Sequence, residues 1–352
     1  YVDELAITVR ALKDVNIVNK EQAKLVTFIT NALYKSVFKY SESIDESYFA
    51  NVDWTAEFDA VADVLVELGD IVETFGVKHN LLSLEGLKGF AQIAKDTTIY
   101  DQEFVANVAD VLKAMTKSDA LLVEAQFGLE YGIAFASMKG IDATAIEVTN
   151  EELAADLVEL SDVLVKVVDA NVLGFALAGE ALNQDKFAGL VEAVQAVLDL
   201  NIVQDIRTEL LNFAFGKVGL VVEEDKLEAI NWNEEIDVIG ELLYAANDAL
   251  NALEVYTLAD IKGINVKEYL TINYQTNDIL EAVAGLLEVA IESQLVETVL
   301  FPVSEKFLAA ENLAGLGDLH NIYANFDEVA EDVEKVIAII EAVVDLNVCS
   351  FV

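Results

Sequence analysis

The chain has 352 residues, 54% of them hydrophobic and only one of them proline, a composition that argues against disorder and favours long helices. Its 63 acidic and 21 basic side chains give a formal net charge of −42. Such a surface repels phosphates and anionic membrane faces, so we expect neither nucleic acid nor membranes as partners. We interpret the acid as a coat that keeps a hydrophobic protein soluble. The alternative interpretation is a polyanion that collects divalent cations weakly.

Residues 1–50 are interpreted as an incomplete repeat, because the sequence begins in the middle of a repeat unit. Leu5, Val9 and Leu12 keep one apolar helical face, and Asp14-Val-Asn-Ile-Val then turns the chain before a second helix at 22–38. Related phrases occur at three later places, and asparagine tolerates the left-handed conformation that ends many helices. The asparagines predicted to end helices in this way are Asn16, Asn171, Asn201 and Asn347.

A helix that we call helix A is predicted to begin near Asp53. Trp54, Phe58, Val61, Leu65, Leu68 and Val72 place one apolar stripe along it. Related stretches begin near residues 149, 232 and 325. Aligned on a shared glutamate (Glu57, Glu152, Glu235 and Glu328), the copies are separated by 95, 83 and 93 residues. A nearly constant separation indicates a tandem repeat.

Each helix A is followed by a connector of variable length and then by two further helices. The connectors are predicted at 78–98, 178–186 and 255–276, helix B at 104–115, 187–198 and 279–289, and helix C at 118–137, 205–218 and 292–308. Gly140 and Gly219 are expected to end two of the C helices, and Pro302 is expected to kink or split the last.

The predicted fold is therefore all-α, with tandem three-helix repeats of about 90 residues stacked into an elongated solenoid or rod. The predicted boundaries give a partial repeat with helices B and C, three full repeats and a final partial repeat with helix A: 1–50, 51–145, 146–228, 229–323 and 324–352. We expect the parent chain to continue in both directions. The most apolar long stretch, at 280–303, contains four glutamates, so no membrane insertion is expected.

Motifs for catalysis, cofactors and metals are weak. The two histidines, His79 and His320, lie in predicted connectors or loops, and the single cysteine, Cys349, excludes an intrachain disulfide. Zinc needs about four suitable ligands, and a Ser-His-acid triad would have to use one of these two histidines. Paired carboxylates are common in so acidic a chain and indicate no acid–base role by themselves. We therefore predict no catalytic residue, no cofactor and no metal site, and hence no enzyme.

The two tryptophans, Trp54 and Trp232, open helix A in two of the copies. We interpret them as large residues that anchor the start of helix A against the preceding helix C. The alternative interpretations are an exposed platform that stacks on a sugar and a surface on which a partner docks.

The predicted function is that of a non-enzymatic structural protein, a segment of a larger acidic stalk, adhesin or filament subunit, whose partners are neighbouring repeats or subunits. The alternative is a repeat scaffold that binds a protein or glycan through its connectors, above all 255–276. In general character the chain resembles large acidic helical-repeat proteins of bacterial surfaces. This likeness implies an extracellular or cell-surface location, with the cytoplasm as the alternative.

Overall fold

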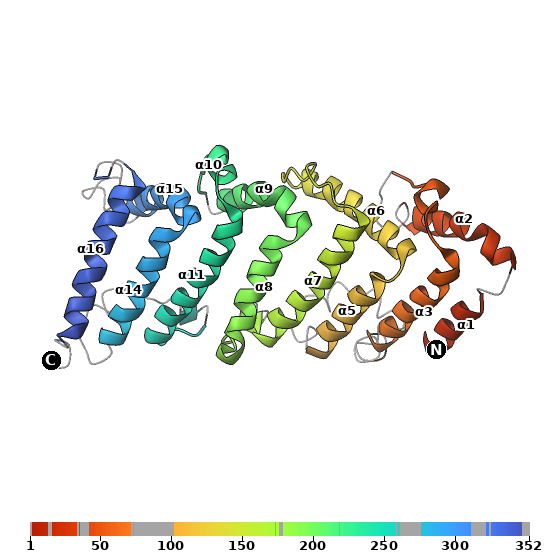
Figure 1. Cartoon of the computed structure of the whole chain (residues 1–352), viewed down its shortest axis with the longest axis horizontal. Coiled ribbons are helices and arrows are strands. Elements are labelled where there is room, and N and C mark those ends of the chain that lie inside the picture. Colours follow the sequence, from red (N-terminus) through yellow and green to blue (C-terminus); the bar gives the residue numbers. More distant parts are fainter. Residues whose placement is uncertain are drawn as a thin grey trace. The chain divides into compact units, whose positions relative to one another are not determined.

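The computed structural model describes residues 2–12, 16–33, 35, 42–71, 73, 102–172, 174–175, 179–217, 219–257, 259–260, 276–310, 322–323 and 325–346. These residues contain helices and no strand, so the predicted all-helical class is confirmed for them (Figure 1). The elements are, in chain order, α1 (Val2–Leu12), α2 (Asn16–Leu33), η2 (Glu46–Phe49), α3 (Trp54–Ile71), α5 (Gln102–Met115), α6 (Asp119–Met138), α7 (Asn150–Asp169), η6 (Gln184–Lys186), α8 (Phe187–Asp199), α9 (Asn201–Lys217), α10 (Glu224–Glu228), α11 (Trp232–Ala252), α14 (Thr276–Glu292), α15 (Gln294–Ala310) and α16 (Phe326–Asp345).

The chain forms two compact units. Unit 1 comprises Tyr1–Asp169 and Leu200–Ile206, and unit 2 comprises Ala170–Asp199 and Arg207–Val352. The division passes through α9 at Ile206, whose backbone leaves helical geometry with φ −129° and ψ 19°. The five segments predicted from the sequence are a finer division, which stays a prediction.

In unit 1 the helices α1, α3, α5 and α7 form a row in which each packs on the next (Figure 1). One core cluster joins α6 to the segment before α3 through Phe127, Ile44 and Phe49, with Trp54 packed against it. A second cluster joins α3 to α5 through Val64 and other small apolar side chains. Helix α3 therefore has neighbours on two sides, and this explains why its buried residues do not follow a single stripe.

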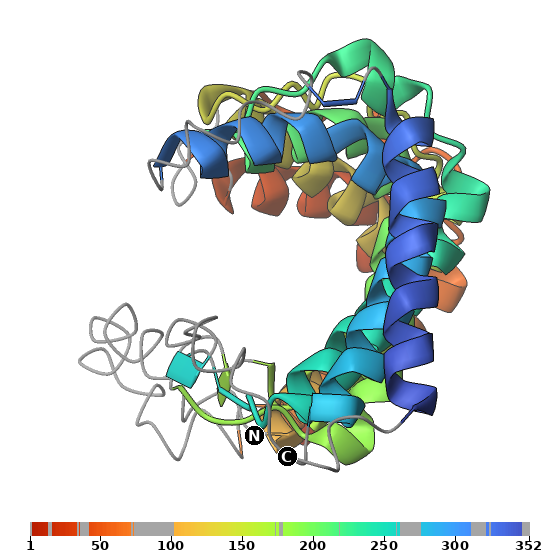
Figure 2. The ribbon, with the colours of Figure 1, turned by 90° about the vertical axis from the view of Figure 1, so that its left-hand side faces the viewer.

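Unit 2 contains a second row, in which α8, α11, α14 and α16 pack in turn. Helix α15 extends away from the end of α14 and runs crosswise to it (Figure 2). Helices α8 and α11 approach closely at Gly240, where an added Cβ would lie 2.5 Å from the side-chain amide nitrogen of Gln195. That amide donates a hydrogen bond to the backbone carbonyl of Ile236 at 3.2 Å.

Several helix ends are formed by the residues that the sequence indicates. Asn171, Gly140 and Gly219 have φ values of 57°, 88° and 71°, the left-handed conformation expected of residues that end helices. At the start of α7, Thr149 and Glu152 form a reciprocal capping box. The Asn325 side chain likewise accepts a hydrogen bond from the Glu328 amide at the start of α16.

Other predictions about helix ends were wrong or lie outside the described residues. Asn16 and Asn201 do not end helices but are the first residues of α2 and α9, which therefore begin earlier than predicted. For Asn201 the reason is an acceptor from another helix, described below. Pro302 lies inside α15 and does not split it. Asn347 falls outside the described residues.

The predicted apolar stripe also needs correction. Leu68 of α3 is 37% exposed and Val336 of α16 is 45% exposed, whereas Glu57, which we did not expect inside, is only 4% exposed. The positions that are buried include small residues such as Ala62, because neighbouring helices approach from two directions.

Candidate functional site

Most residues considered for chemistry lie outside the part of the chain that the structure describes. These are both histidines, Cys349, the connector at 78–98 and, in the third connector, residue 258 and residues 261–275. Among the described residues no three His, Cys, Asp or Glu side chains are arranged to hold a metal ion. The prediction that the chain has no catalytic, cofactor or metal site therefore stays a prediction.

Both tryptophans pack against the protein. The Trp54 ring lies 5.9 Å from the Phe49 ring, centroid to centroid, and joins the cluster around Ile44 and Phe127. The Trp232 ring is covered by the guanidinium of Arg207, whose Cζ lies 4.7 Å from the ring centroid. Because Arg207 belongs to α9, the helix C before Trp232, this contact agrees with the anchoring interpretation. It also leaves less of the ring free to stack on a sugar.

Arg207 is only 7% exposed. One of its terminal nitrogens donates to the backbone carbonyl of Leu198, near the C-terminal end of α8, while its Nε has no hydrogen-bond partner. Burial lowers the pKa of this guanidinium, and the charge of Asp199 opposes that shift. The carbonyl and the aromatic face together compensate a cation that has lost most of its water.

We name the helices by their places in the predicted repeat: A-type for α3, α7, α11 and α16, B-type for α1, α5, α8 and α14, and C-type for α2, α6, α9 and α15. A junction is the point where a B-type helix gives way to a C-type helix. The residues that open the four C-type helices or cap their starts are Asn16, Ser118, Asn201 and Ser293.

At the Ser118 junction the acceptor is a buried glutamate from α3. The Glu57 carboxylate accepts a hydrogen bond from the Ser118 hydroxyl at 2.5 Å and another from the Asp119 amide at 2.7 Å. The Ser118 hydroxyl in turn accepts from the Leu121 amide at 3.0 Å. A carboxylate at a helix N-terminus satisfies free amides and interacts favourably with the helix dipole, so the buried charge is compensated.

The Ser293 junction in unit 2 is built in the same way. Glu235 of α11 is 1% exposed and accepts hydrogen bonds from the Ser293 hydroxyl at 2.5 Å and from the amides of Gln294 and Leu295 at 2.9 and 3.0 Å. The Ser293 hydroxyl accepts from the Val296 amide at 3.1 Å. Both glutamates are the fourth residue of an A-type helix that begins with tryptophan.

The Asn201 junction uses a shorter acid from another position. Asp156, the seventh residue of α7, is 5% exposed. It accepts hydrogen bonds from the Asn201 amide at 2.9 Å, the Asn201 side chain at 2.8 Å and the Ile202 amide at 2.9 Å. These bonds allow α9 to begin at Asn201, and they lie within unit 1.

The alignment on a shared glutamate is corrected by this geometry. Glu57 and Glu235 are the fourth residues of their helices, whereas Glu152 and Glu328 are third residues and are exposed. The fourth residues of α7 and α16 are apolar and buried: Leu153 and Val329. The four glutamates are therefore two kinds of residue, a buried tie between helices and an exposed first-turn acid.

Comparisons with protein-family models, curated proteins and solved structures found no match to this chain. In the described part of the chain no single helix is long and apolar enough to cross a membrane, although the bent pair formed by 184–199 and 201–217 passes that test of length and composition together.

Unit 2 also contains a cavity of about 440 Å³ between α10, the first half of α15 and the start of α16. Its wall combines the rings of Phe301 and Phe326 with polar groups from Lys226, Gln294 and Thr298. Part of this wall is already engaged, because the Gln294 side-chain oxygen accepts a hydrogen bond from the Asn231 amide at 2.9 Å. The cavity mixes aromatic surface with hydrogen-bonding groups, a combination typical of sites for small polar ligands.

Proposed function

We propose that the chain is a non-enzymatic structural protein, made of three-helix repeats of about 90 residues that stack into an elongated solenoid. In this proposal it is a segment of a larger stalk, adhesin or filament subunit. The observation that supports it best is the recurrence of one construction at three junctions, where an acid of an A-type helix holds the start of the next C-type helix.

The ties suit a load-bearing role. Each joins residues 45 to 62 positions apart in the sequence, so it connects the A-type helix of a predicted repeat to its C-type helix, with the B-type helix between them in the chain. Each acceptor is charged and buried, and such hydrogen bonds are about twice as strong as neutral ones. Stacked units whose stability depends on nearest neighbours behave as an extended, stiff body.

The negative surface fits the same role. With a net charge of −42, copies of the chain repel one another sideways, which prevents lateral aggregation. We place the protein outside the cell or at its surface, with the cytoplasm as the alternative, and its partners are neighbouring repeats or subunits. Divalent cations bind weakly in this proposal. Equal concentrations of magnesium and calcium should therefore raise the thermal midpoint alike, and a large calcium-specific rise would contradict this part.

Small-angle X-ray scattering of the isolated chain tests the stacked arrangement. A single compact globule of this length has a radius of gyration of about 20 Å. Eight row helices spaced by about 8–10 Å would instead give a longest dimension of about 80 Å and a clearly larger radius of gyration. A radius near the globular value would refute the elongated solenoid.

The cavity in unit 2 favours a second candidate function, a repeat scaffold that binds a protein or glycan. The connectors first considered for this role lie mostly outside the described residues, whereas the cavity is formed by α10, α15 and α16. Saturation-transfer NMR with a panel of oligosaccharides and short peptides tests it. Binding should be lost in Thr298→Trp, which fills the cavity, and kept in Thr257→Trp, which lies elsewhere in unit 2. The absence of binding by the parent chain would eliminate this candidate.

A further inference from the structure

The last described helix, α16, has one packed face and one open face. Phe326 and Val329 are buried, and the helix packs on α14. Farther along, Val336 and Ile339 are 45% and 63% exposed, and Leu346, which caps the C-terminal end of the helix, is 70% exposed. Exposed apolar side chains spaced three to seven residues apart form a stripe along a helix, and such a stripe is typical of a face that receives another helix.

The same open face carries Asp332, whose position in the helix corresponds to that of Asp156 in α7. Asp332 is the seventh residue of α16, as Asp156 is the seventh residue of α7. Both helices begin after a capping residue, have glutamate third, and bury an aliphatic residue fourth. Asp156 is buried and holds the Asn201 junction, whereas Asp332 is exposed.

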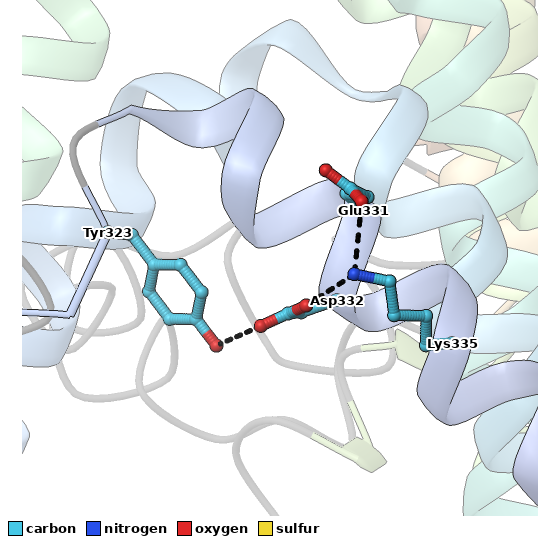
Figure 3. A network of polar contacts seen from close by, with 4 residues as sticks. All are labelled: Tyr323, Glu331, Asp332 and Lys335. Atoms are coloured by element: carbon cyan, nitrogen blue, oxygen red, sulfur yellow. Dashed lines mark hydrogen bonds and ion pairs between the residues drawn. The ribbon is translucent and has the colours of Figure 1, made fainter.

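Figure 3 shows what Asp332 contacts instead. One carboxylate oxygen lies 3.0 Å from the Lys335 ammonium, and the other accepts a hydrogen bond from the Tyr323 hydroxyl at 3.3 Å. The hydrogen bond and charge of Lys335 lower the pKa of Asp332, so the carboxylate is ionised at neutral pH. Exposed contacts of this kind are weak, so they can be exchanged for stronger ones at little cost.

The sequence contains a second junction of the asparagine kind. Residues 14–18 read Asp-Val-Asn-Ile-Val, and residues 199–203 read Asp-Leu-Asn-Ile-Val. Helix α2 begins at Asn16 as α9 begins at Asn201. The described serine junctions pair with a glutamate and the described asparagine junction pairs with an aspartate. By the same pairing, the junction that begins at Asn16 requires an aspartate at the seventh position of an A-type helix, and Asp332 is such a residue.

We propose that the open face of α16 docks the α1–α2 pair of a second copy of this chain, with the Asp332 carboxylate accepting hydrogen bonds from the backbone amides of Asn16 and Ile17. The inference rests on the proposed structural function and names its partner and contact. On α1, Ala6 is buried and Ile7 is 65% exposed, so Ile7 belongs to a side of α1 that is open to receive Ile339. The contact joins different surfaces of the two copies, so it propagates from copy to copy into an open filament or a closed ring.

The net charge determines the conditions for the experiment. Two copies with −42 each repel strongly at low ionic strength, and salt screens that repulsion. We therefore expect sedimentation velocity to show association that increases with protein concentration and with sodium chloride from 0.05 to 1 M. Asp332→Ala should weaken the association constant roughly tenfold, the usual effect of removing a helix cap.

Asp327→Ala is the matched control, because it removes one exposed negative charge from the first turn of the same helix. It should leave the association constant unchanged or raise it slightly. Equal weakening by both variants would mean that the loss is not specific to the Asp332 tie, and this would overturn the proposal. Circular dichroism of both variants should match that of the parent chain, since Asp332 is exposed.

Cysteine pairing tests the direction of the contact. In a Cys349→Ser background, a mixture of Ile7→Cys and Ile339→Cys proteins should form disulfide-linked pairs, while neither protein alone should. Linkage of Ile339→Cys to itself would show a two-fold contact and overturn the proposal. A chain that stays monomeric at every salt concentration would overturn it as well. A monomer with an elongated scattering profile would refute only this contact, whereas a globular profile would refute the proposed function itself.

Discussion

The Glu235 carboxylate and the Ser293 hydroxyl are 58 residues apart in the sequence and 2.5 Å apart in space. The same carboxylate accepts two backbone amides at the start of α15, so one side chain of α11 holds three donors. Nearly all of its surface is removed from water. The stability of unit 2 should therefore depend on this acid far more than on the many exposed acids around it.

Glu235→Gln tests that dependence with almost no change in shape. The side-chain amide of glutamine replaces one acceptor oxygen with an NH₂ donor. This donor then faces the hydroxyl and amide donors at the start of α15. We expect the free energy of unfolding to fall by about 2–3 kcal/mol, measured by urea denaturation followed by circular dichroism. Hydrogen exchange at the Leu295 amide should also become faster. Glu234→Gln, at the exposed neighbouring position, should change stability by less than about 0.5 kcal/mol. Equal effects of the two substitutions would contradict the assignment.

The Asp156–Asn201 pair can be measured with a double-mutant cycle. Asp156→Ala removes the acceptor of three hydrogen bonds, whereas Asn201→Ala removes one of the donors. The single substitutions should cost about 2–3 and about 1 kcal/mol, with a coupling of about 1 kcal/mol between them. A cycle between Asp156→Ala and Asn150→Ala, which is exposed on the same helix, should give no coupling. Strict additivity of Asp156→Ala and Asn201→Ala would show that the contact contributes nothing.

Glu124 in α6 predicts a dependence on pH. Burial raises the pKa of this carboxyl above its ordinary value of 4.5, although a hydrogen bond from the Thr30 hydroxyl acts in the opposite direction. The folded chain thus binds the proton more tightly than the unfolded chain, so Glu124 lowers stability as pH rises above about 4.5. Glu124→Gln should stabilise the protein at pH 7 by less than about 1 kcal/mol, since solvent screens a half-buried charge. The urea midpoints of Glu124→Gln and of the parent chain should become equal near pH 4.

The control for that experiment is Glu151→Gln, which removes an exposed carboxylate from α7. It should change the free energy of unfolding by less than about 0.5 kcal/mol at pH 7. If Glu124→Gln instead destabilised the chain at pH 7, the hydrogen bond from Thr30 would outweigh the cost of burial.

Arg207 and Trp232 offer a fluorescence measurement. The chain has two tryptophans, so Trp54→Phe leaves Trp232 as the only one. In that background Arg207→Lys replaces a planar cation with a compact ammonium that covers the ring poorly. We expect a red shift of the emission and a loss of about 1–2 kcal/mol in stability. Arg10→Lys, at the part-exposed pair with Asp63, should cost less than about 1 kcal/mol and leave the emission unchanged. Unchanged emission in Arg207→Lys would show that the contact is not formed.

The starts of α7 and α16 were predictable because capping residues and apolar spacing agree there, whereas the side chain of Asn231 makes no capping hydrogen bond at the start of α11. Thr149 and Asn325 are followed three residues later by glutamate, and both cap their helices in the structure. Local rules were enough, because every group involved lies within one turn of the same helix. The start of α9 was predicted too late for the opposite reason. At α9, the Asn201 amide depends on Asp156, which is 45 residues away.

The acidic character and first-turn position of the buried glutamates do not distinguish them from the exposed ones. In a chain with 63 acids, Glu57 and Glu235 look like any exposed residue of a first turn. One signal does separate them, because each follows a tryptophan by three residues: Trp54 and Trp232. The large ring begins the helix against the protein, and a residue one turn later on the same face is buried with it. Glu152 and Glu328 lack that neighbour and remain at the surface.

The two kinds of tie differ in the identity of the acidic residue and in the length of its side chain. A glutamate reaches a serine from the fourth place of its helix, and an aspartate, shorter by one methylene, reaches an asparagine from the seventh. Both members of each described tie lie within one predicted segment, 51–145, 146–228 or 229–323. Each of these segments therefore carries both parts of its own tie and can close it at any place in the array. Exchanging the acid alone, however, would leave a carboxylate that does not fit its partner.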